Sequence, residues 1–168
     1  MGHPALRRQA EPLSQKEIAD PETALFIDSM IATMREYNGA GLAAPQVHLS
    51  KQIVVIEAQS NSRYPNGEQV PLTVLINPKI TSFSDKMQEG WEGCLSVAKL
   101  WGRVKRSCEV TVEALNRYGT INVINAEGFF AVVLQHEIDH LYGKLFVDRM
   151  DDLSSLCFSS EYRRYHSG

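Results

Sequence analysis

The sequence has few cysteines, no long apolar run and no excess of basic residues. Its three cysteines, Cys94, Cys108 and Cys157, are an odd set without the spacing of a disulfide framework, so a reducing cytoplasm is expected. No apolar run approaches the ~20 residues of a membrane span, and the N-terminal stretch lacks the features of a signal or transit peptide. These absences predict a cytoplasmic protein that does not enter a membrane.

Positive charge is also scarce. The formal net charge is −3, and the longest basic runs are dipeptides, among them Arg7-Arg8 and Arg163-Arg164. Direct binding of nucleic acid is therefore not expected. A chain of 168 residues, of which 43% are hydrophobic, is predicted to form one domain over residues 1–168 and to bury roughly 70% of its unfolded surface. We also expect a monomer.

The pattern His-Glu-x-x-His occurs at residues 136–140. On an α-helix, residues four apart lie on one face with Cβ atoms roughly 5–6 Å apart, so His136 and His140 can reach one metal ion. Glu137 projects beside them. Two imidazole ligands and a carboxylate that moves protons are typical of metal-assisted hydrolysis.

The surrounding sequence predicts a helix from about Glu127 to Tyr142, with Gly143 at its C-terminal end. Its apolar residues surround the helix axis, which is typical of a buried helix. A buried helix does not carry unsatisfied polar side chains at successive turns. We therefore favour a metal site over the alternative, which is two core histidines that are hydrogen-bonded to neighbours.

A catalytic metal site usually has three protein ligands and an open position. The metalloprotease pattern HExxHxxGxxH is excluded because Phe146 stands at its last position. Glu161, in the polar C-terminal tail, is a weak candidate for the carboxylate ligand of another protease class. Cys94 is favoured because a thiolate binds divalent transition metals strongly, although spacing alone leaves a small buried hydrophobe possible.

The remaining pattern predicts two further helices, one of them weak, and several strands. A helix is expected over residues 21–38, an extended segment over 1–20, and a weak terminal helix over 151–162. Loops are expected at 39–46, 59–70 and 85–90, and an extended piece at 145–150. Strands are predicted at 52–58, 72–76, 79–84, 103–106, 107–115 and 120–125. The fold class is therefore α+β, with antiparallel sheets packed around a central buried HExxH helix.

Three separated motifs stand out in the sequence, at residues 39–46 (GAGLAAPQ), 92–96 (EGCLS) and 135–140 (QHEIDH). In this order they resemble the GxGxAAxQ, EGCLS and QHExxH motifs of the peptide deformylase family. The family comprises metal hydrolases that remove the formyl group from the N-terminal formylmethionine of newly synthesised polypeptides. The resemblance implies this activity, with release of formate, and an α+β fold around the HExxH helix.

The resemblance also implies roles for individual residues. Cys94, His136 and His140 would bind one metal ion per chain, with Fe²⁺ as the physiological ion and Zn²⁺, Ni²⁺ or Co²⁺ as possible substitutes. Glu137 would act as general base and acid. Gln46 and the backbone N–H of Leu95 would face the developing oxyanion.

Substrate contacts are expected around the same motifs. Ala40, Gly41 and Gly93 would let a formylmethionyl peptide lie close to the backbone, since small residues allow such an approach. Phe129, Val132 and Val133 precede His136 by one to two helical turns. They are predicted to line an apolar pocket for the methionine side chain, against the alternative of ordinary core packing.

Several features lie outside the motifs. Glu92, Asp139 and Arg106 are candidates for a buried charged network that orients the metal ligands, against the alternative of a solvated surface. Ala98 stands where the family usually has proline, and Trp101 where many members have a substrate-contacting arginine. These departures keep open a silent paralogue that only binds formylated peptides.

The C-terminal tail carries two further features, a carboxylate and a basic pair. A different HExxH metalloprotease or amidase, with Glu161 as ligand, is the remaining alternative among enzymes. The pair Arg163-Arg164 is thin evidence for contact with the ribosome exit region.

Overall fold

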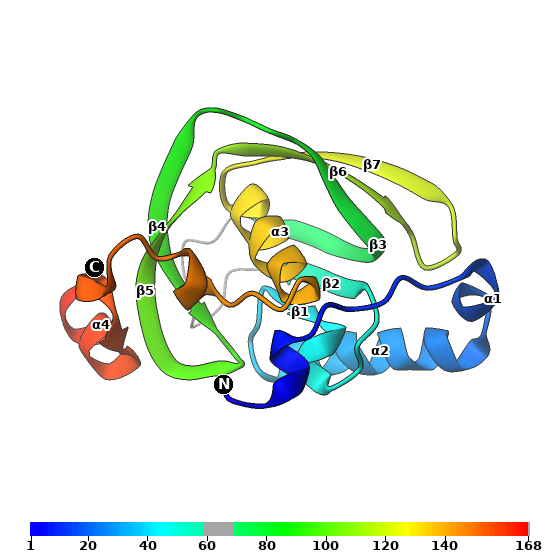
Figure 1. The fold of residues 1–168 in the computed structure, drawn as a ribbon, viewed down its shortest axis with the longest axis horizontal. Coiled ribbons are helices and arrows are strands. Elements are labelled where there is room, and N and C mark those ends of the chain that lie inside the picture. The colour runs from blue at the N-terminus through cyan, green and yellow to red at the C-terminus, as the bar shows by residue number, and fades with distance from the viewer. Residues whose placement is uncertain (59–68, 168) are drawn as a thin grey trace.

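Two antiparallel sheets surround the HExxH helix in a computed structural model that describes residues 1–58 and 69–167 (Figure 1). The helices are α1 (Gln15–Ile18), α2 (Pro21–Glu36), α3 (Gly128–Leu141) and α4 (Ser159–Tyr165), with 3₁₀ turns at Pro4–Arg7, Ala44–Val47, Phe146–Arg149 and Leu153–Ser155. The strands are β1 (Gly41–Ala43), β2 (Ile53–Ala58), β3 (Val70–Phe83), β4 (Met87–Cys94), β5 (Val97–Ser107), β6 (Glu109–Leu115), β7 (Ile121–Glu127) and β8 (Cys157–Phe158). The expected α+β class is confirmed.

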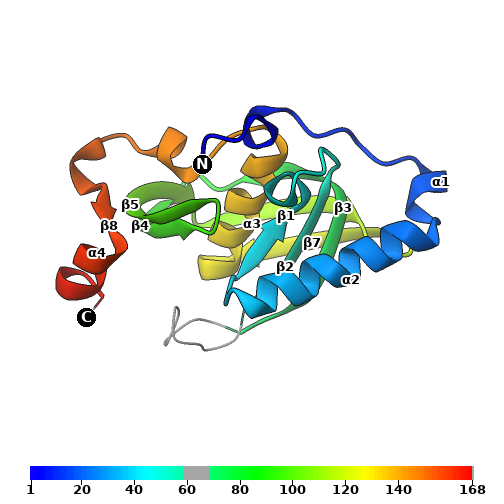
Figure 2. The same ribbon diagram turned by 90° about the horizontal axis from the view of Figure 1, so that it is seen from below.

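The larger sheet has the strand order β1-β2-β3-β6-β7, and the smaller one has the order β4-β5-β8. The pairs within both sheets are antiparallel. In Figure 1 the two sheets enclose α3, and in Figure 2 α2 lies against the opposite face of the larger sheet. Both β1 and β4 are terminal strands of their sheets, which becomes important at the site.

Strand β2 explains how the larger sheet is covered on both faces. Val54 and Ile56 pack with the apolar residues of α3, whereas Ile53 and Val55 pack with those of α2. Alternate residues of a strand point to opposite faces, so a strand with helices on both sides needs apolar residues throughout. This is why residues 52–58 form a continuous apolar run rather than an alternating one.

Helix α2 follows its sequence signals. The Asp20 side chain accepts a hydrogen bond from the Glu22 amide at 2.9 Å, and Pro21 occupies the first turn. The apolar stripe of the helix is buried, namely Ile27, Met30, Ile31 and Met34. Helix α3 is buried by both sheets, as its all-round apolar sequence predicts.

Gly143 lies just after the C-terminal end of α3, and two features of the structure favour glycine there. Its φ angle is +69°, which favours glycine, and a Cβ there would lie 2.6 Å from the Arg7 carbonyl oxygen. The N-terminal segment therefore passes directly over the end of the helix. That segment is less extended than predicted, because it contains a 3₁₀ turn and α1, and Leu6, Leu13 and Ile18 are buried.

Strand β3 continues through Asn77-Pro78, where the sequence predicted an end. The pairing with β6 shifts register between Ile76 and Lys79, and Asn77 has a φ of +52°. This irregularity accommodates proline, which cannot donate a ladder hydrogen bond. The Asn77 side chain instead bonds both backbone groups of Leu13, each at 2.8 Å.

Three segments form strands that the sequence did not predict. Residues 41–43 form β1 and residues 87–90 begin β4, where loops were predicted, and residues 97–102, for which no element was predicted, begin β5. The sequence signals failed because glycine and polar residues interrupt the apolar alternation of β4, and strand pairing overrode the local propensity.

The predicted piece at 145–150 contains a 3₁₀ turn, and the terminal helix lies at Ser159–Tyr165 rather than over 151–162. The loop predicted at 59–70 falls almost wholly outside the described residues.

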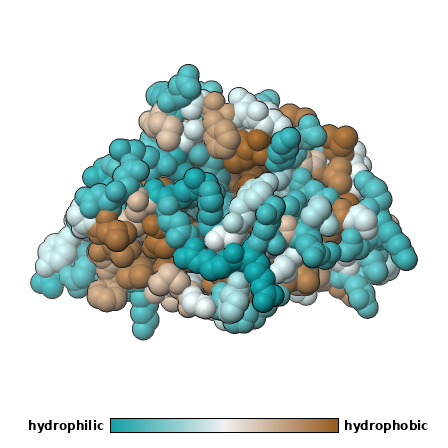
Figure 3. Space-filling model, in the orientation of Figure 1, coloured by the Kyte–Doolittle hydropathy of each residue, from teal (hydrophilic) through white to brown (hydrophobic). Residues whose placement is uncertain are grey.

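The surface view in Figure 3 shows hydrophobic side chains in separate patches among hydrophilic ones. Within residues 1–58 and 69–167, no helix is both long enough and apolar enough to cross a membrane.

Candidate active site

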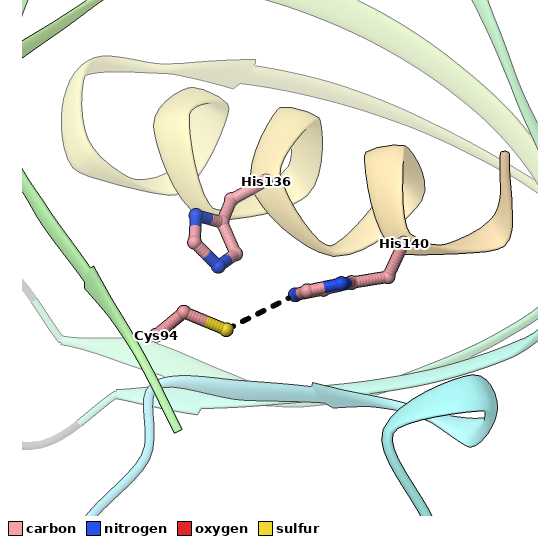
Figure 4. Close-up of side chains that lie close together, drawn as sticks. All are labelled: Cys94, His136 and His140. Atoms are coloured by element: carbon pink, nitrogen blue, oxygen red, sulfur yellow. Dashed lines mark hydrogen bonds between the residues drawn. The ribbon is translucent and has the colours of Figure 1, made fainter. Parts of the chain in front are cut away.

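Cys94, His136 and His140 converge between α3 and the end of β4 (Figure 4). One possible ligand atom from each lies within 4.8 Å of the others, and the Cys94 Sγ atom is 3.3 Å from the His140 Nε2 atom. A tetrahedral ion bound at about 2.1 Å from nitrogen and 2.3 Å from sulfur needs donors roughly 3.6 Å apart. The three predicted ligands therefore fit a single metal ion.

Without a metal ion, the charges in the cluster favour a thiolate at Cys94 and a proton on His136, and His136 must give up that proton to bind a metal. Burial raises the pKa of the Cys94 thiol, but hydrogen bonds and charge from His136 and His140 outweigh burial and hold this pKa well below its ordinary value. Burial lowers the pKa of His136, but Cys94, Glu92 and Glu137 hold it well above the ordinary value. Cys94 is thus favoured as the thiolate, which is the ligand form of cysteine.

Behind the ligands lies the buried charged network that the sequence suggested. The Glu92 carboxylate is 2.7 Å from the His136 Nδ1 atom and accepts two hydrogen bonds from Arg106 at 2.8 and 3.1 Å. Arg106 also donates to Asp139 at 2.6 Å, and Asp139 accepts a further bond from Arg149 at 3.0 Å.

The network has a clear electrostatic consequence. Burial of Glu92 raises its pKa, but His136 and Arg106 outweigh this and lower the pKa to about 2. The carboxylate therefore stays ionised and fixes the His136 ring, with Nε2 left to face the ligand cluster.

Glu137 lies next to the ligands with its side chain buried against β1. A Cβ on Gly41 would be only 2.5 Å from the Glu137 Cγ atom. Any side chain at residue 41 would therefore displace the carboxylate. The sequence suggested that this glycine lets substrate approach, and the structure adds that it makes room for Glu137.

Gln46 reaches the cluster from the 3₁₀ turn after β1. Its Oε1 atom accepts a hydrogen bond from the Ala43 amide at 2.7 Å. Its Nε2 atom donates to the Ser96 hydroxyl at 3.2 Å and lies 3.6 Å from the Cys94 Sγ atom. With the oxygen so occupied, the amide NH₂ group is directed toward the metal cluster.

A cavity of about 240 Å³ opens beside these groups. The predicted site residues that line it are Ala40, Gly41, Gln46, Gly93, Cys94, Leu95, Phe129, Val132, Val133, His136 and Glu137. His140 is 1% exposed and lies behind the others. The cavity thus joins the two motifs at 39–46 and 92–96 to the first turns of α3.

Sequence reasoning missed part of the cavity wall. Gln88, Glu89, Gly90, Trp91 and Val104 also line it. Four of these belong to β4, immediately before the motif at residues 92–96, in a stretch predicted to be mostly loop. The available signal was the aromatic Trp91 next to the motif. Trp101 is absent from the lining and instead covers the outer side of Gly93.

Comparison with known proteins decides the family. The family model for polypeptide deformylase matches residues 1–155. The chain belongs to the peptide deformylase family. It is 42% identical over 159 residues to peptide deformylase 1 of Bordetella pertussis, covering 95% of this chain and 89% of that protein. It is 40% identical to peptide deformylase 2 of Pseudomonas putida, with the same coverage.

The fold agrees with this family. A crystal structure of class I type b peptide deformylase from Acinetobacter baumannii with Met-Ala-Ser bound superposes with a TM-score of 0.87 at 41% identity, covering 89% of this chain and 94% of that one. The deformylase described here is therefore a metal-dependent hydrolase that removes the N-formyl group from the formylmethionine of newly synthesised polypeptides, releasing formate.

The protease alternative loses its support. Glu161 is exposed in α4, and it does not belong to the group of potential ligands formed by Cys94, His136 and His140. In Figure 1 the smaller sheet lies between α4 and α3.

Proposed function

We propose that Cys94, His136 and His140 hold one Fe²⁺ ion in this deformylase, and that Zn²⁺, Ni²⁺ or Co²⁺ can occupy the same position. The convergence of these three side chains is the observation that carries the proposal. A thiolate with two imidazoles suits divalent transition metals rather than Mg²⁺ or Ca²⁺. The ion would supply positive charge at the formyl oxygen and lower the pKa of a nearby water molecule toward about 7.

Glu137 is the proton carrier of the proposed reaction. Its carboxylate takes a proton from the attacking water as the new C–O bond forms at the formyl carbon. It returns the proton to the leaving amine as the C–N bond breaks, which gives formate and a free N-terminus. Gln46 and the Leu95 backbone N–H would donate hydrogen bonds to the developing oxyanion. The Gln46 NH₂ group near Cys94 and the place of Leu95 in the cavity wall support these roles.

The substrate is proposed to lie as an extended peptide between β1 and β4. These are the terminal strands of their sheets, and Ala40, Gly41 and Gly93 line the cavity between them. Terminal strands offer unpaired backbone groups for such an added strand. The methionine side chain would enter the apolar part of the cavity, against Phe129, Val132 and Val133. The Acinetobacter relative with Met-Ala-Ser bound supports a peptide of this class.

The cellular setting of the proposal follows from its substrate. Formylmethionyl chains arise during protein synthesis, so residues 1–168 are proposed to act as one monomeric catalytic domain in the cytoplasm. The exposed pair Arg163-Arg164 on α4 is the one feature offered for contact with the ribosome exit region.

Formate release from formyl-Met-Ala-Ser tests the proposal, with protein purified without oxygen because Fe²⁺ and Cys94 both oxidise. We expect Glu137→Gln to lower kcat by about 10²–10⁴-fold, since it removes the general base and acid. Glu161→Gln is the matched control and should leave the rate unchanged. Cys94→Ser should lose metal content. A wild-type enzyme that releases no formate with Fe²⁺ or Ni²⁺ contradicts the proposed function, and retention of metal by Cys94→Ser contradicts the ligand set.

A further inference from the structure

An aromatic cluster lies where α4 meets the smaller sheet, and one of its members, Trp91, also lines the cavity. The Trp101 ring stacks on the Tyr162 ring of α4, with centroids 4.2 Å apart and planes 1° from parallel. Trp91 meets Tyr162 at 5.2 Å and His166 at 4.7 Å. Trp91 and Trp101 are the only tryptophans of the sequence. The cluster therefore joins the C-terminal tail to the two strands that carry the Cys94 motif (Figure 1).

Trp101 lies directly on the backbone of the residue before Cys94. It pairs with Gly93 in the register of β4 and β5, and a Cβ on Gly93 would be 2.7 Å from the Trp101 Cε2 atom. An aromatic ring that covers a glycine on a terminal strand restores the side-chain packing that glycine lacks. Trp101 therefore fixes a position of β4 that would otherwise be flexible.

The fixed position matters because the strand pairing changes at the next residue. A register shift separates Gly93 from Cys94, and Cys94 pairs with Val97. Such bulges redirect a side chain out of the regular alternation of a strand. The direction of the Cys94 Sγ atom thus depends on where Gly93 is held.

The tail holds Trp101 in two ways. Strand β8 pairs with β5 at Trp101 and Cys157, and α4 supplies the Tyr162 ring. Helix α4 has only seven residues, and an isolated helix that short is unstable in water. Its place depends on packing, to which the aromatic contacts contribute.

We propose that residues 156–166 form a positioning element for Cys94, acting through Tyr162, Trp101 and Gly93. The proposal rests on the metal-ligand role given to Cys94 above. The family model ends at residue 155, so this element lies beyond the matched region. Docking of residues 156–166 should then strengthen metal binding. Metal binding should stabilise the docked tail by the same factor, because coupling between two sites is reciprocal.

The test measures Co²⁺ affinity by chelator competition, followed through the cobalt–thiolate absorption band. Tyr162→Ala removes the stacked ring and should weaken Co²⁺ binding by about two- to tenfold, the range that an aromatic pair supports. Tyr162→Phe keeps the ring and should restore affinity. Tyr165→Ala is the matched control, because Tyr165 lies in the same helix and is 63% exposed. Tyr162→Leu replaces the alanine variant if the latter does not fold.

A second measurement tests reciprocity in the wild-type protein. Co²⁺ should slow cleavage by trypsin after Arg163 and Arg164, and tryptophan fluorescence should report release of the tail. Equal Co²⁺ affinity in Tyr162→Ala and Tyr165→Ala, with the tail released in the former, would overturn the proposal. So would a Tyr162→Ala variant that loses only thermal stability. Failure of the wild type to bind Co²⁺ through Cys94 would instead refute the ligand set itself.

Discussion

The two sides of the metal cluster are held in different ways. His136 and His140 stand on one buried helix, and their spacing follows from the helical repeat alone. Cys94 stands at the end of a terminal strand, at a register shift, and depends on contacts with residues far away in the sequence. The helix side is therefore determined locally, whereas the strand side is determined by the tertiary fold.

Two contacts connect the sides. Arg106, on β5, bonds Glu92 of β4 and Asp139 of α3, and Glu92 contacts His136. Gln46, after β1, contacts the strand side alone, at Cys94 and Ser96. Variants of Arg106 and Gln46 test how strongly the position of the strand side depends on these contacts.

The largest effect is expected for Arg106→Ala. Arg106 is 4% exposed, and its loss would leave Glu92 and Asp139 buried without their shared cation. Removing one partner of a buried ion pair costs about 3–5 kcal/mol. Unfolding by urea should report a loss of this size, whereas Lys105→Ala, at an exposed neighbouring position, should change stability little. A loss below about 1 kcal/mol, the level of a surface ion pair, would show that the network does not hold the two sides together.

A smaller effect, on rate rather than stability, is expected for Gln46→Ala. The amide would no longer donate to the oxyanion, and loss of one such donor typically costs about 2.7–4 kcal/mol of transition-state stabilisation. The measurement is kcat/KM for formyl-Met-Ala-Ser, with the exposed His48→Ala as control. If only KM rises and kcat is unchanged, Gln46 binds substrate without stabilising the transition state.

The smallest effect is expected far from the metal cluster, at the N-terminus of α1. There Ser14 and Glu17 form a capping box, in which each side chain bonds the backbone of the other residue. The Ser14 backbone and side chain bond the Glu17 carboxylate and, with Lys51, lower its pKa to about 2 from 4.5. A depressed carboxyl pKa contributes stability that is present above pH 4.5 and is lost as pH falls toward 2. Glu17→Gln should therefore lower Tm slightly at pH 6, and the difference should shrink steadily below pH 4.5. A difference that is independent of pH would contradict this origin.

The comparison also explains which predictions succeeded. The boundaries of α2 and α3, the strands at 52–58 and 107–115, and the α+β class were readable because apolar periodicity and caps are local signals. Strand β1 and the first half of β4 were predicted as loops, and the first half of β5 was not predicted as a strand. These segments lack a clear alternation of apolar and polar residues, and pairing with neighbouring strands makes them extended.

The sequence by itself determined that His136, His140 and Glu137 share one region of a buried helix, because the spacing of side chains on a helix is set by covalent geometry and hydrogen bonding. Tertiary structure alone decided how Cys94 meets them, how Gly41 makes room for Glu137, and how Trp101 and Tyr162 brace the strand. Those contacts join residues that are distant in sequence, and their geometry depends on strand register and packing rather than on any local pattern.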